Sequence, residues 1–228
     1  MPDTPPLPSC QTPLPILYVD KELVLVNKPS GLLSVPGRDP RYYDSVYSRL
    51  LAHFGDIHVV HRLDMDTSGV MVMARHKEAL RHLSRQFQQR TTSKHYLAWV
   101  DGQLLQPEGE VNLPLRCDWP NRPRQMVDML AGKPSLTRYK LCHYDRVRDA
   151  SLVRLYPHTG RSHQLRVHMA ALGHPILGCR FYATDRALAK APRLQLHAEY
   201  LRVLQPATNL PISQQVRAAD FFQITAAG

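Results

Sequence analysis

The apolar residues of the chain gather in short runs, most of which have the length and composition of β-strands. Continuous or alternating runs rich in Val, Leu and aromatic residues are typical of strands. They predict strands at residues 23–26, 59–60, 70–73, 96–100, 136–141 and 152–156. Helices are predicted at residues 77–90, where Leu80, Leu83 and Phe87 have helical spacing, and at residues 162–172, which follow a turn and end at Gly173. Many strands with few helices indicate an α+β fold.

The length of the chain favours one domain. A chain of 228 residues lies within the range of single domains. Residues 1–15 contain six prolines and a single charged residue, Asp3. Because proline is excluded from helix interiors and central strands, this segment is predicted to be a flexible N-terminal tail. We therefore expect one domain over residues 16–228, without internal repeats.

The charge of the chain suggests an anionic partner. Lys and Arg number 29 against 19 Asp and Glu, which gives a formal net charge of +10. Nucleic-acid phosphates, anionic membranes and acidic substrates are the usual partners of such a surplus, although it can also be no more than solvated surface charge. The basic residues in and beside the predicted helix 77–90 form a candidate phosphate-binding face: Arg75, Lys77, Arg81, Arg85, Arg90 and Lys94.

No run of apolar residues approaches the roughly 18–20 that span a bilayer, and the N-terminus does not resemble a signal peptide. We therefore expect a cytoplasmic protein. Its four cysteines are widely spaced and form no C-x-x-C motif, which is typical of a reducing compartment. His163 and His168 are five residues apart and would not share a helix face, so no metal site is predicted.

The densest cluster of polar residues lies between two predicted strands, at residues 61–69. There, Asp64 can serve as an ionised carboxylate on a short connection, with Arg62 nearby to contact an anion. A polar loop that only caps local backbone groups is the alternative. A third interpretation is a glycosidase that uses Asp64 and Asp66 as paired carboxylates. The residues alone leave these interpretations open.

The same cluster, HRLDMDTSG, resembles the H-R-L-D-x-x-T-S-G signature of the RluA family of pseudouridine synthases. Residues 27–32 resemble the N-K-P-x-G-L segment of that family, and residues 94–98 resemble its K-x-Y-x-A strand. Residues 159–168 resemble its T-G-R-x-H-Q-[IL]-R-V-H motif. Four motifs in the same order exclude coincidence. One departure is Cys179, at a position where the family commonly has an acidic residue in a G-D-x-x-Y segment.

The resemblance implies a catalytic domain with a mixed, mostly antiparallel sheet flanked by helices and loops, a central RNA-binding cleft and no S4 domain. It implies isomerisation of uridine to pseudouridine, in which the N1–C1′ bond breaks, the uracil rotates and C5 joins C1′. The implied substrates are tRNA, at position thirty-two of the anticodon loop, and a hairpin of 23S rRNA. No cofactor, metal, membrane or protein partner is implied, and we expect a monomer.

Three residues match the catalytic positions of the family. Asp64 matches the essential aspartate, which attacks C1′ or removes a C2′ proton. Arg166 matches the arginine that pairs with it, and Tyr96 matches the tyrosine that stacks on uracil and can relay the C5 proton. Arg62 matches a wedge that fills the vacated base stack, with a phosphate contact as the alternative. The other predicted substrate- and RNA-binding residues are His61, Thr67, Trp119, Arg122, Arg161 and Leu165.

Two other functions stay open beside the isomerase. A catalytically idle RNA-binding module would bind RNA in a salt-sensitive manner, even after Asp64→Ala, and would modify no base. A glycoside or nucleoside hydrolase using Asp64 and Asp66 would release sugar or free base.

Overall fold

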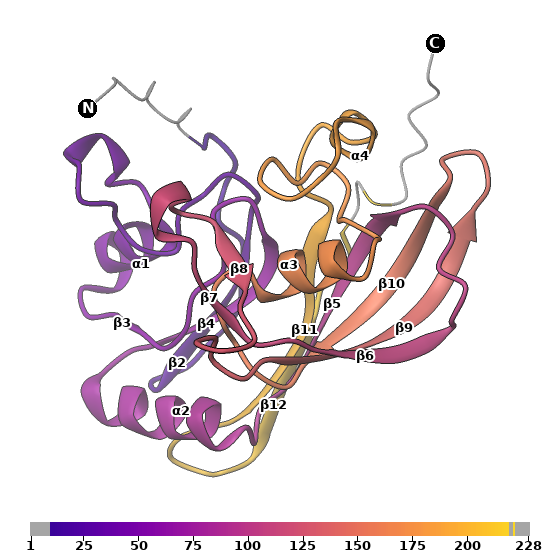
Figure 1. The fold of residues 1–228 in the computed structure, drawn as a ribbon. Coiled ribbons are helices and arrows are strands. Elements are labelled where there is room, and N and C mark those ends of the chain that lie inside the picture. Colours follow the sequence, from indigo (N-terminus) through magenta and orange to yellow (C-terminus); the bar gives the residue numbers. More distant parts are fainter. Residues whose placement is uncertain (1–9, 219–220, 222–228) are drawn as a thin grey trace. The chain divides into compact units, whose positions relative to one another are not determined.

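A computed structural model describes residues 10–218 and 221 (Figure 1). The described chain forms two compact units. The first comprises residues 10–93 and 200–216, and the second comprises residues 94–199, 217–218 and 221. The strand at residues 196–204 contributes its first four residues to the second unit and its last five to the first.

The first unit is built on antiparallel strand pairs. Its elements are β1 (Ile16–Val19), β2 (Leu23–Lys28), η1 (Pro40–Tyr42), α1 (Val46–Phe54), β3 (His58–Val59), β4 (Ser68–Ala74), α2 (Lys77–Gln89) and β12 (Pro211–Gln215). β2 pairs with both β1 and β4, and β3 also pairs with β4. The strands follow the order β1-β2-β4-β11, and β12 pairs with the last five residues of β11. The pairs β1–β2, β2–β4, β3–β4 and β11–β12 are all antiparallel.

Helix α2 covers one face of this sheet because its apolar residues share one side. Ala79 and Leu83 are fully buried and pack with Leu25 and Val72 of the sheet. The ring of His76 caps the start of the helix by accepting a hydrogen bond from the Ala79 amide at 3.3 Å. The helix predicted at residues 77–90 is thereby confirmed within one residue.

The second unit contains the longer strands. Its elements are β5 (Ser93–Asp101), β6 (Glu108–Asn112), β7 (Leu115–Cys117), η2 (Trp119–Asn121), β8 (Gln125–Val127), β9 (Leu136–Asp145), β10 (Ala150–Pro157), α3 (Gln164–Ala171), α4 (Asp185–Ala189) and the first half of β11 (Leu196–Leu204). The strand order is β11-β5-β10-β9-β6. β7 and β8 form a separate hairpin.

Alternation along β5 and β10 divides the core of the second unit between the two faces of its sheet. On one face, Ala98 and Val153 pack with Leu165 and Met169 of α3. On the other face Trp99 is buried, and its indole N–H donates to the carbonyl oxygen of Phe221 at 3.0 Å. α3 therefore lies on a fixed apolar floor.

The structure confirms the predicted α+β class and all six predicted strands. The helix predicted at residues 162–172 is the shorter α3, followed by Gly173 with a φ of 87°. The sequence did not predict α1, α4, β1, β6, β7, β8, β11 or β12. No helix in the described part of the chain is long and apolar enough to cross a membrane.

Part of the predicted N-terminal tail contacts the first unit. Residues 1–9 lie outside the described residues. The carbonyl oxygens of Cys10 and Thr12 accept hydrogen bonds from the guanidinium of Arg49 on α1, the latter at 2.7 Å. The carbonyl of Pro15 accepts from the Asn27 amide at 2.9 Å.

Candidate active site

The loop that carries Asp64 is fastened to the end of β2 by a buried lysine. The side chain of Lys28 has no exposed surface. Its Nζ donates to the carbonyl oxygens of Pro29 at 2.9 Å, Leu32 at 2.7 Å and Met65 at 2.8 Å. Three carbonyl acceptors match the three N–H bonds of an ammonium group. One charged group thus ties residues 29–32 to the residue that follows Asp64.

Two serines fasten the same loop on either side of Asp64. Ser34 Oγ donates to the Leu63 carbonyl at 2.6 Å and accepts from the Leu63 amide at 3.0 Å. Ser30 Oγ donates to the Asp66 carbonyl at 2.7 Å. The backbone is therefore held immediately before and after Asp64. This explains why the N-K-P-S-G-L segment accompanies the aspartate motif, a role that local sequence does not reveal.

His61 is embedded in the first unit. Its Nε2 accepts a hydrogen bond from the Val72 amide of β4 at 3.1 Å. Its ring stacks on Phe87 of α2, with 4.7 Å between centroids. These contacts anchor the first residue of the motif to the sheet and the helix.

The other predicted residues of this loop differ in exposure. Arg62 is exposed and Asp64 is half-buried. Thr67 is buried, and its amide donates to the Asp64 carbonyl at 3.1 Å, which closes a tight turn. The loop therefore offers a partly accessible carboxylate beside an exposed cation, on a backbone that other residues hold.

In the second unit, α3 supplies a buried arginine. Arg166 is only 2% exposed. Its Nε donates to Cys179 Sγ at 3.3 Å. Its guanidinium carbon lies 5.1 Å from the ring centroid of Phe181 and 5.5 Å from that of Tyr182. The thiol that departs from the family pattern thus accepts a hydrogen bond from the predicted catalytic arginine.

Tyr96 and Leu165 belong to one apolar cluster on the same face of the sheet. Leu165 is buried in the core of the second unit, and the half-buried Tyr96 packs against that core. The turn before α3 is fixed by Gln164, whose Oε1 accepts from Thr159 Oγ1 at 2.7 Å and from the Arg161 amide at 3.0 Å. The second unit thus brings together an aromatic ring, an apolar floor and a buried cation, with Arg161 exposed nearby along the chain.

The hairpin β7–β8 carries the predicted RNA-contacting pair at its tip. Trp119 is 65% exposed, and the guanidinium carbon of Arg122 lies 4.7 Å from the indole centroid. An exposed cation–aromatic pair can stack on an unpaired base and contact its phosphate.

Two groups close to Tyr96 in sequence have lowered pKa values. Burial lowers the pKa of the Lys94 ammonium. Burial also lowers the pKa of His95, and the nearby carboxylate of Glu199 partly opposes this shift. His95 Nε2 lies 3.1 Å from that carboxylate, which also pairs with Arg154 at 3.2 Å. This partly buried cluster has no signal in the local sequence, because His95, Arg154 and Glu199 come from three different strands.

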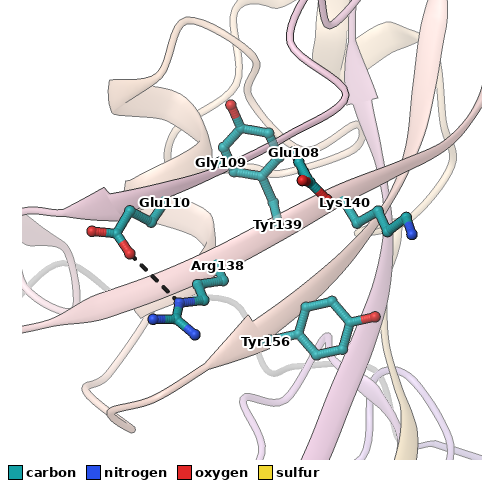
Figure 2. A pocket seen from close by; sticks show the side chains of 7 residues that line it. All are labelled: Glu108, Gly109, Glu110, Arg138, Tyr139, Lys140 and Tyr156. Atoms are coloured by element: carbon teal, nitrogen blue, oxygen red, sulfur yellow. Dashed lines mark ion pairs between the residues drawn. The ribbon is translucent and has the colours of Figure 1, made fainter.

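A surface pocket of about 360 Å³ lies elsewhere in the second unit (Figure 2). Its lining residues are Glu108, Gly109, Glu110, Arg138, Tyr139, Lys140 and Tyr156. Arg138 pairs with Glu110 at 3.5 Å, and Lys140 is the register partner of Glu108. Because its charges are balanced, the pocket does not favour an anionic ligand, and it contains no predicted site residue.

The two histidines considered as metal ligands have other partners. His163 Nδ1 lies 2.6 Å from the Tyr182 hydroxyl oxygen. His168 is fully buried, with one ring nitrogen 2.9 Å from Thr137 Oγ1 and the other 3.0 Å from the Leu113 carbonyl oxygen. Both nitrogens of His168 are therefore engaged in hydrogen bonds. Within residues 10–218 and 221, no group of three His, Cys, Asp or Glu residues is placed to hold a metal ion.

Comparison with known proteins gives consistent matches. Residues 22–171 match the family model described as RNA pseudouridylate synthase. A Pasteurella multocida (strain Pm70) protein named dual-specificity RNA pseudouridine synthase RluA is 54% identical over 196 residues, which cover 86% of this chain and 89% of that protein. The protein of the same name from Escherichia coli (strain K12) is 56% identical over 194 residues, covering 85% and 88%.

Solved structures give the same match at the level of the fold. The human RNA pseudouridylate synthase domain containing 1 superposes with a TM-score of 0.77 at 29% identity, covering 92% of this chain and 85% of that one. The human RNA pseudouridylate synthase domain containing 4 has a TM-score of 0.72 at 26% identity, covering 91% and 90%.

Proposed function

Because this chain belongs to the RNA pseudouridylate synthase family and is an RNA pseudouridine synthase, we propose that Asp64, Tyr96 and Arg166 carry out its isomerisation of uridine. The observation that carries the proposal is the held loop of the first unit. There, Lys28 and Ser34 fix the backbone on both sides of a half-buried carboxylate. A group that must meet one ribose carbon benefits from such pre-organisation.

The Asp64 carboxylate acts on the ribose of the target uridine, either by adding to C1′ or by removing the C2′ proton. The N1–C1′ bond breaks, and the uracil turns within the pocket and bonds to C1′ through C5. In the first route C5 displaces the carboxylate from C1′, and in the second route the C2′ proton returns to C2′. The C5 proton then leaves, and N1 gains a proton. The atoms balance without an oxidant, a reductant or a second substrate.

Arg166 and Tyr96 support this chemistry in different ways. Arg166 matches the family arginine that pairs with the catalytic aspartate, a role suited to a planar cation that stays charged at any physiological pH. Tyr96 stacks on the uracil while the glycosidic bond is broken, and its phenol relays the C5 proton. Leu165, in the same apolar cluster as Tyr96, floors the uracil pocket.

Base flipping and RNA docking use the exposed residues. A uridine inside folded RNA must leave its stack to reach the carboxylate, and the exposed Arg62 fills the space it leaves. Trp119 and Arg122 contact the RNA from the tip of the β7–β8 hairpin. Arg161 contacts a phosphate. His61 and Thr67 act through the loop that they hold.

The names of the relatives support a proposal of dual specificity. Relatives 54% and 56% identical to this chain are named dual-specificity RNA pseudouridine synthases. We propose that this chain likewise modifies two RNAs, a tRNA at position thirty-two of the anticodon loop and a hairpin of 23S rRNA. It acts as a monomer in the cytoplasm and requires neither a cofactor nor a protein partner.

The experiment is tritium release from C5-labelled uridine in unmodified tRNA and in a 23S rRNA fragment. The wild-type protein is expected to release tritium from both RNAs, and Asp64→Asn from neither. Asp66→Asn is the matched control, since it removes the neighbouring carboxylate, and it is expected to retain activity. Release from only one RNA would contradict dual specificity. Free uracil that depends on Asp66 would indicate a hydrolase, and RNA binding without release would indicate an idle module.

A further inference from the structure

A phenol group connects the RNA-contacting hairpin of the second unit to the helix that carries Arg166. The Tyr182 hydroxyl accepts a hydrogen bond from the Gln125 amide of β8 at 2.8 Å. The same oxygen lies 2.6 Å from His163 Nδ1. His163 is the residue immediately before α3, three positions before Arg166. One side chain thus joins β8 to the start of α3.

The ring of Tyr182 also contacts the arginine directly. Its centroid lies 5.5 Å from the guanidinium carbon of Arg166, and the Phe181 centroid lies 5.1 Å from it. Cys179 Sγ accepts from Arg166 Nε. The segment 179–182 therefore surrounds the guanidinium through one thiol and two rings, so that a displacement of this segment also displaces the arginine.

The hairpin has a second attachment to the same segment. The guanidinium of Arg124 donates to the Phe181 carbonyl oxygen, and its carbon lies 5.9 Å from the Tyr182 centroid. Gln125 is the first residue of β8 and pairs with Cys117, and Arg124 precedes it in the loop that carries the exposed Trp119. A change in the position of the hairpin is thus transmitted at two points to the residues around Arg166.

His163, which directly precedes α3, has an unusual backbone conformation that depends on its contacts with segment 179–182. His163 has a φ of 53°, a left-handed conformation that non-glycine residues rarely adopt, so tertiary contacts must hold it there. The contacts that hold its ring are the Tyr182 hydroxyl and stacking on Phe181, with 5.6 Å between ring centroids. The same segment that surrounds the guanidinium therefore fixes the start of its helix.

We infer that Tyr182 is a positioning residue, which makes the placement of Arg166 depend on how RNA seats on the β7–β8 hairpin. RNA stacked on Trp119 fixes the hairpin, the hairpin fixes Tyr182, and Tyr182 fixes Arg166 for the isomerisation. The inference rests on the proposed function, because it assumes that Arg166 serves the reaction and that Trp119 contacts RNA.

The first test compares Tyr182→Phe with wild type in single-turnover tritium release at saturating RNA. Phenylalanine keeps the ring against Arg166 and removes both bonds of the hydroxyl. The rate is expected to fall about tenfold, the effect of roughly one hydrogen bond, while the RNA dissociation constant changes less than about twofold. A rate within about twofold of wild type, or a loss confined to affinity, overturns the inference.

A double-mutant cycle separates coupling from simple structural damage. Trp119→Ala is expected to weaken RNA binding about tenfold and to slow the saturated step about fivefold. In the Tyr182→Phe background it should weaken binding equally but slow the saturated step by clearly less than fivefold, because only the Arg124 attachment to segment 179–182 remains. Rate effects that multiply in the double variant overturn the inference.

Two further variants keep the test decisive. Tyr144→Phe is the matched control, since its hydroxyl also makes a hydrogen bond, to Asp149 Oδ1 at 2.8 Å in the β9–β10 turn, and its rate should equal that of wild type. If Tyr182→Phe does not fold, Arg124→Gln is the alternative, because it removes the second attachment at an exposed position. Combined with Trp119→Ala, it should likewise give a rate effect smaller than the product of the two single effects. If Arg124→Gln and Trp119→Ala multiply their rate effects, the inference is overturned.

Failure of the proposed function would give a different result. A wild-type protein that releases no tritium, or an Asp64→Asn variant that does, contradicts the proposed function. An active wild type with an inactive Asp64→Asn and an unaffected Tyr182→Phe contradicts only the role of Tyr182.

Discussion

Replacing Lys28 by methionine tests whether a buried cation holds the Asp64 loop. Methionine has nearly the same length and retains the apolar contacts of the lysine stem, but it removes the ammonium donor from three carbonyl oxygens, of which that of Met65 keeps a second donor, the Gly31 amide. Lys28 is fully buried at the end of β2, so water cannot readily replace the ammonium. The substitution therefore removes the contacts without opening a large cavity.

The expected loss is set by two opposing effects. A hydrogen bond from a charged donor contributes about 1.5–3 kcal/mol, and Lys28 makes three to carbonyls. Removing the charge also relieves a desolvation cost of several kcal/mol for a buried ammonium. The net expectation is a loss of about 2–4 kcal/mol in the free energy of unfolding, a large part of a typical total of about 5–15 kcal/mol.

Urea denaturation of Lys28→Met and wild type measures this loss. Lys21→Met is the matched control, because Lys21 is an exposed lysine two residues before β2. This substitution should change the free energy of unfolding by less than about 0.5 kcal/mol. Among molecules that remain folded, the rate of tritium release should fall more than the RNA affinity, because the loop that positions Asp64 is loosened. A loss below about 1 kcal/mol for Lys28→Met, or an unchanged rate, would refute this account of the loop.

Three shorter predictions concern the buried His168, a pair of glycines with positive φ, and Ser34. Burial lowers the pKa of His168. Below about pH 6.5 the unfolded chain therefore binds a proton that the folded chain does not, so the free energy of unfolding decreases as the pH is lowered. In urea denaturation, this pH dependence should be shallower for His168→Gln than for wild type by up to about 1.4 kcal/mol per pH unit. Gly178→Ala should cost at least about 3 kcal/mol, since φ is 67° and a Cβ would lie 2.0 Å from a backbone carbonyl oxygen. Gly173→Ala, with a φ of 87° but open space, should cost only about 1 kcal/mol, and urea denaturation of both glycine variants measures the difference. Ser34→Ala removes both bonds to Leu63 and should cost about 1–3 kcal/mol while slowing tritium release; unchanged stability and rate would contradict the role of Ser34.

The elements that the sequence predicted are those with a strong local pattern. β4 is a continuous apolar run in which every residue is buried, and the buried residues of α2 have helical spacing. Two of the strands that were missed, β6 and β12, lack such a pattern, whereas β1 and β11 carry apolar residues and were overlooked. β6 reads EGEVN with one buried residue, and β12 reads PISQQ with none. These strands form because a neighbouring strand offers unpaired backbone groups, a long-range cause that a local window does not contain.

The candidate site divides in the same way. Asp64, Tyr96 and Arg166 were predicted because each lies within a recognisable motif. The residues that fix them were not predicted, since each contact joins distant segments. Lys28 reaches Met65 across 37 positions, and Tyr182 reaches Gln125 across 57. A lysine next to an apolar run would ordinarily be taken as exposed, because unpaired lysine is almost never fully buried.

Asp64 and Arg166, the two proposed catalytic residues, are both held by side chains from elsewhere in their own unit, which determines the expected effect of substitutions. Asp64 lies on a loop outside regular structure, and Arg166 lies in the first turn of a short helix whose preceding residue has a left-handed backbone. Neither is fixed by the apolar core alone. Substitutions of Lys28, Ser34 or Tyr182 should therefore slow the chemical step more than they weaken RNA binding. Substitutions of exposed residues such as Trp119 should affect binding first, because they alter the surface that meets RNA and leave the held backbone intact.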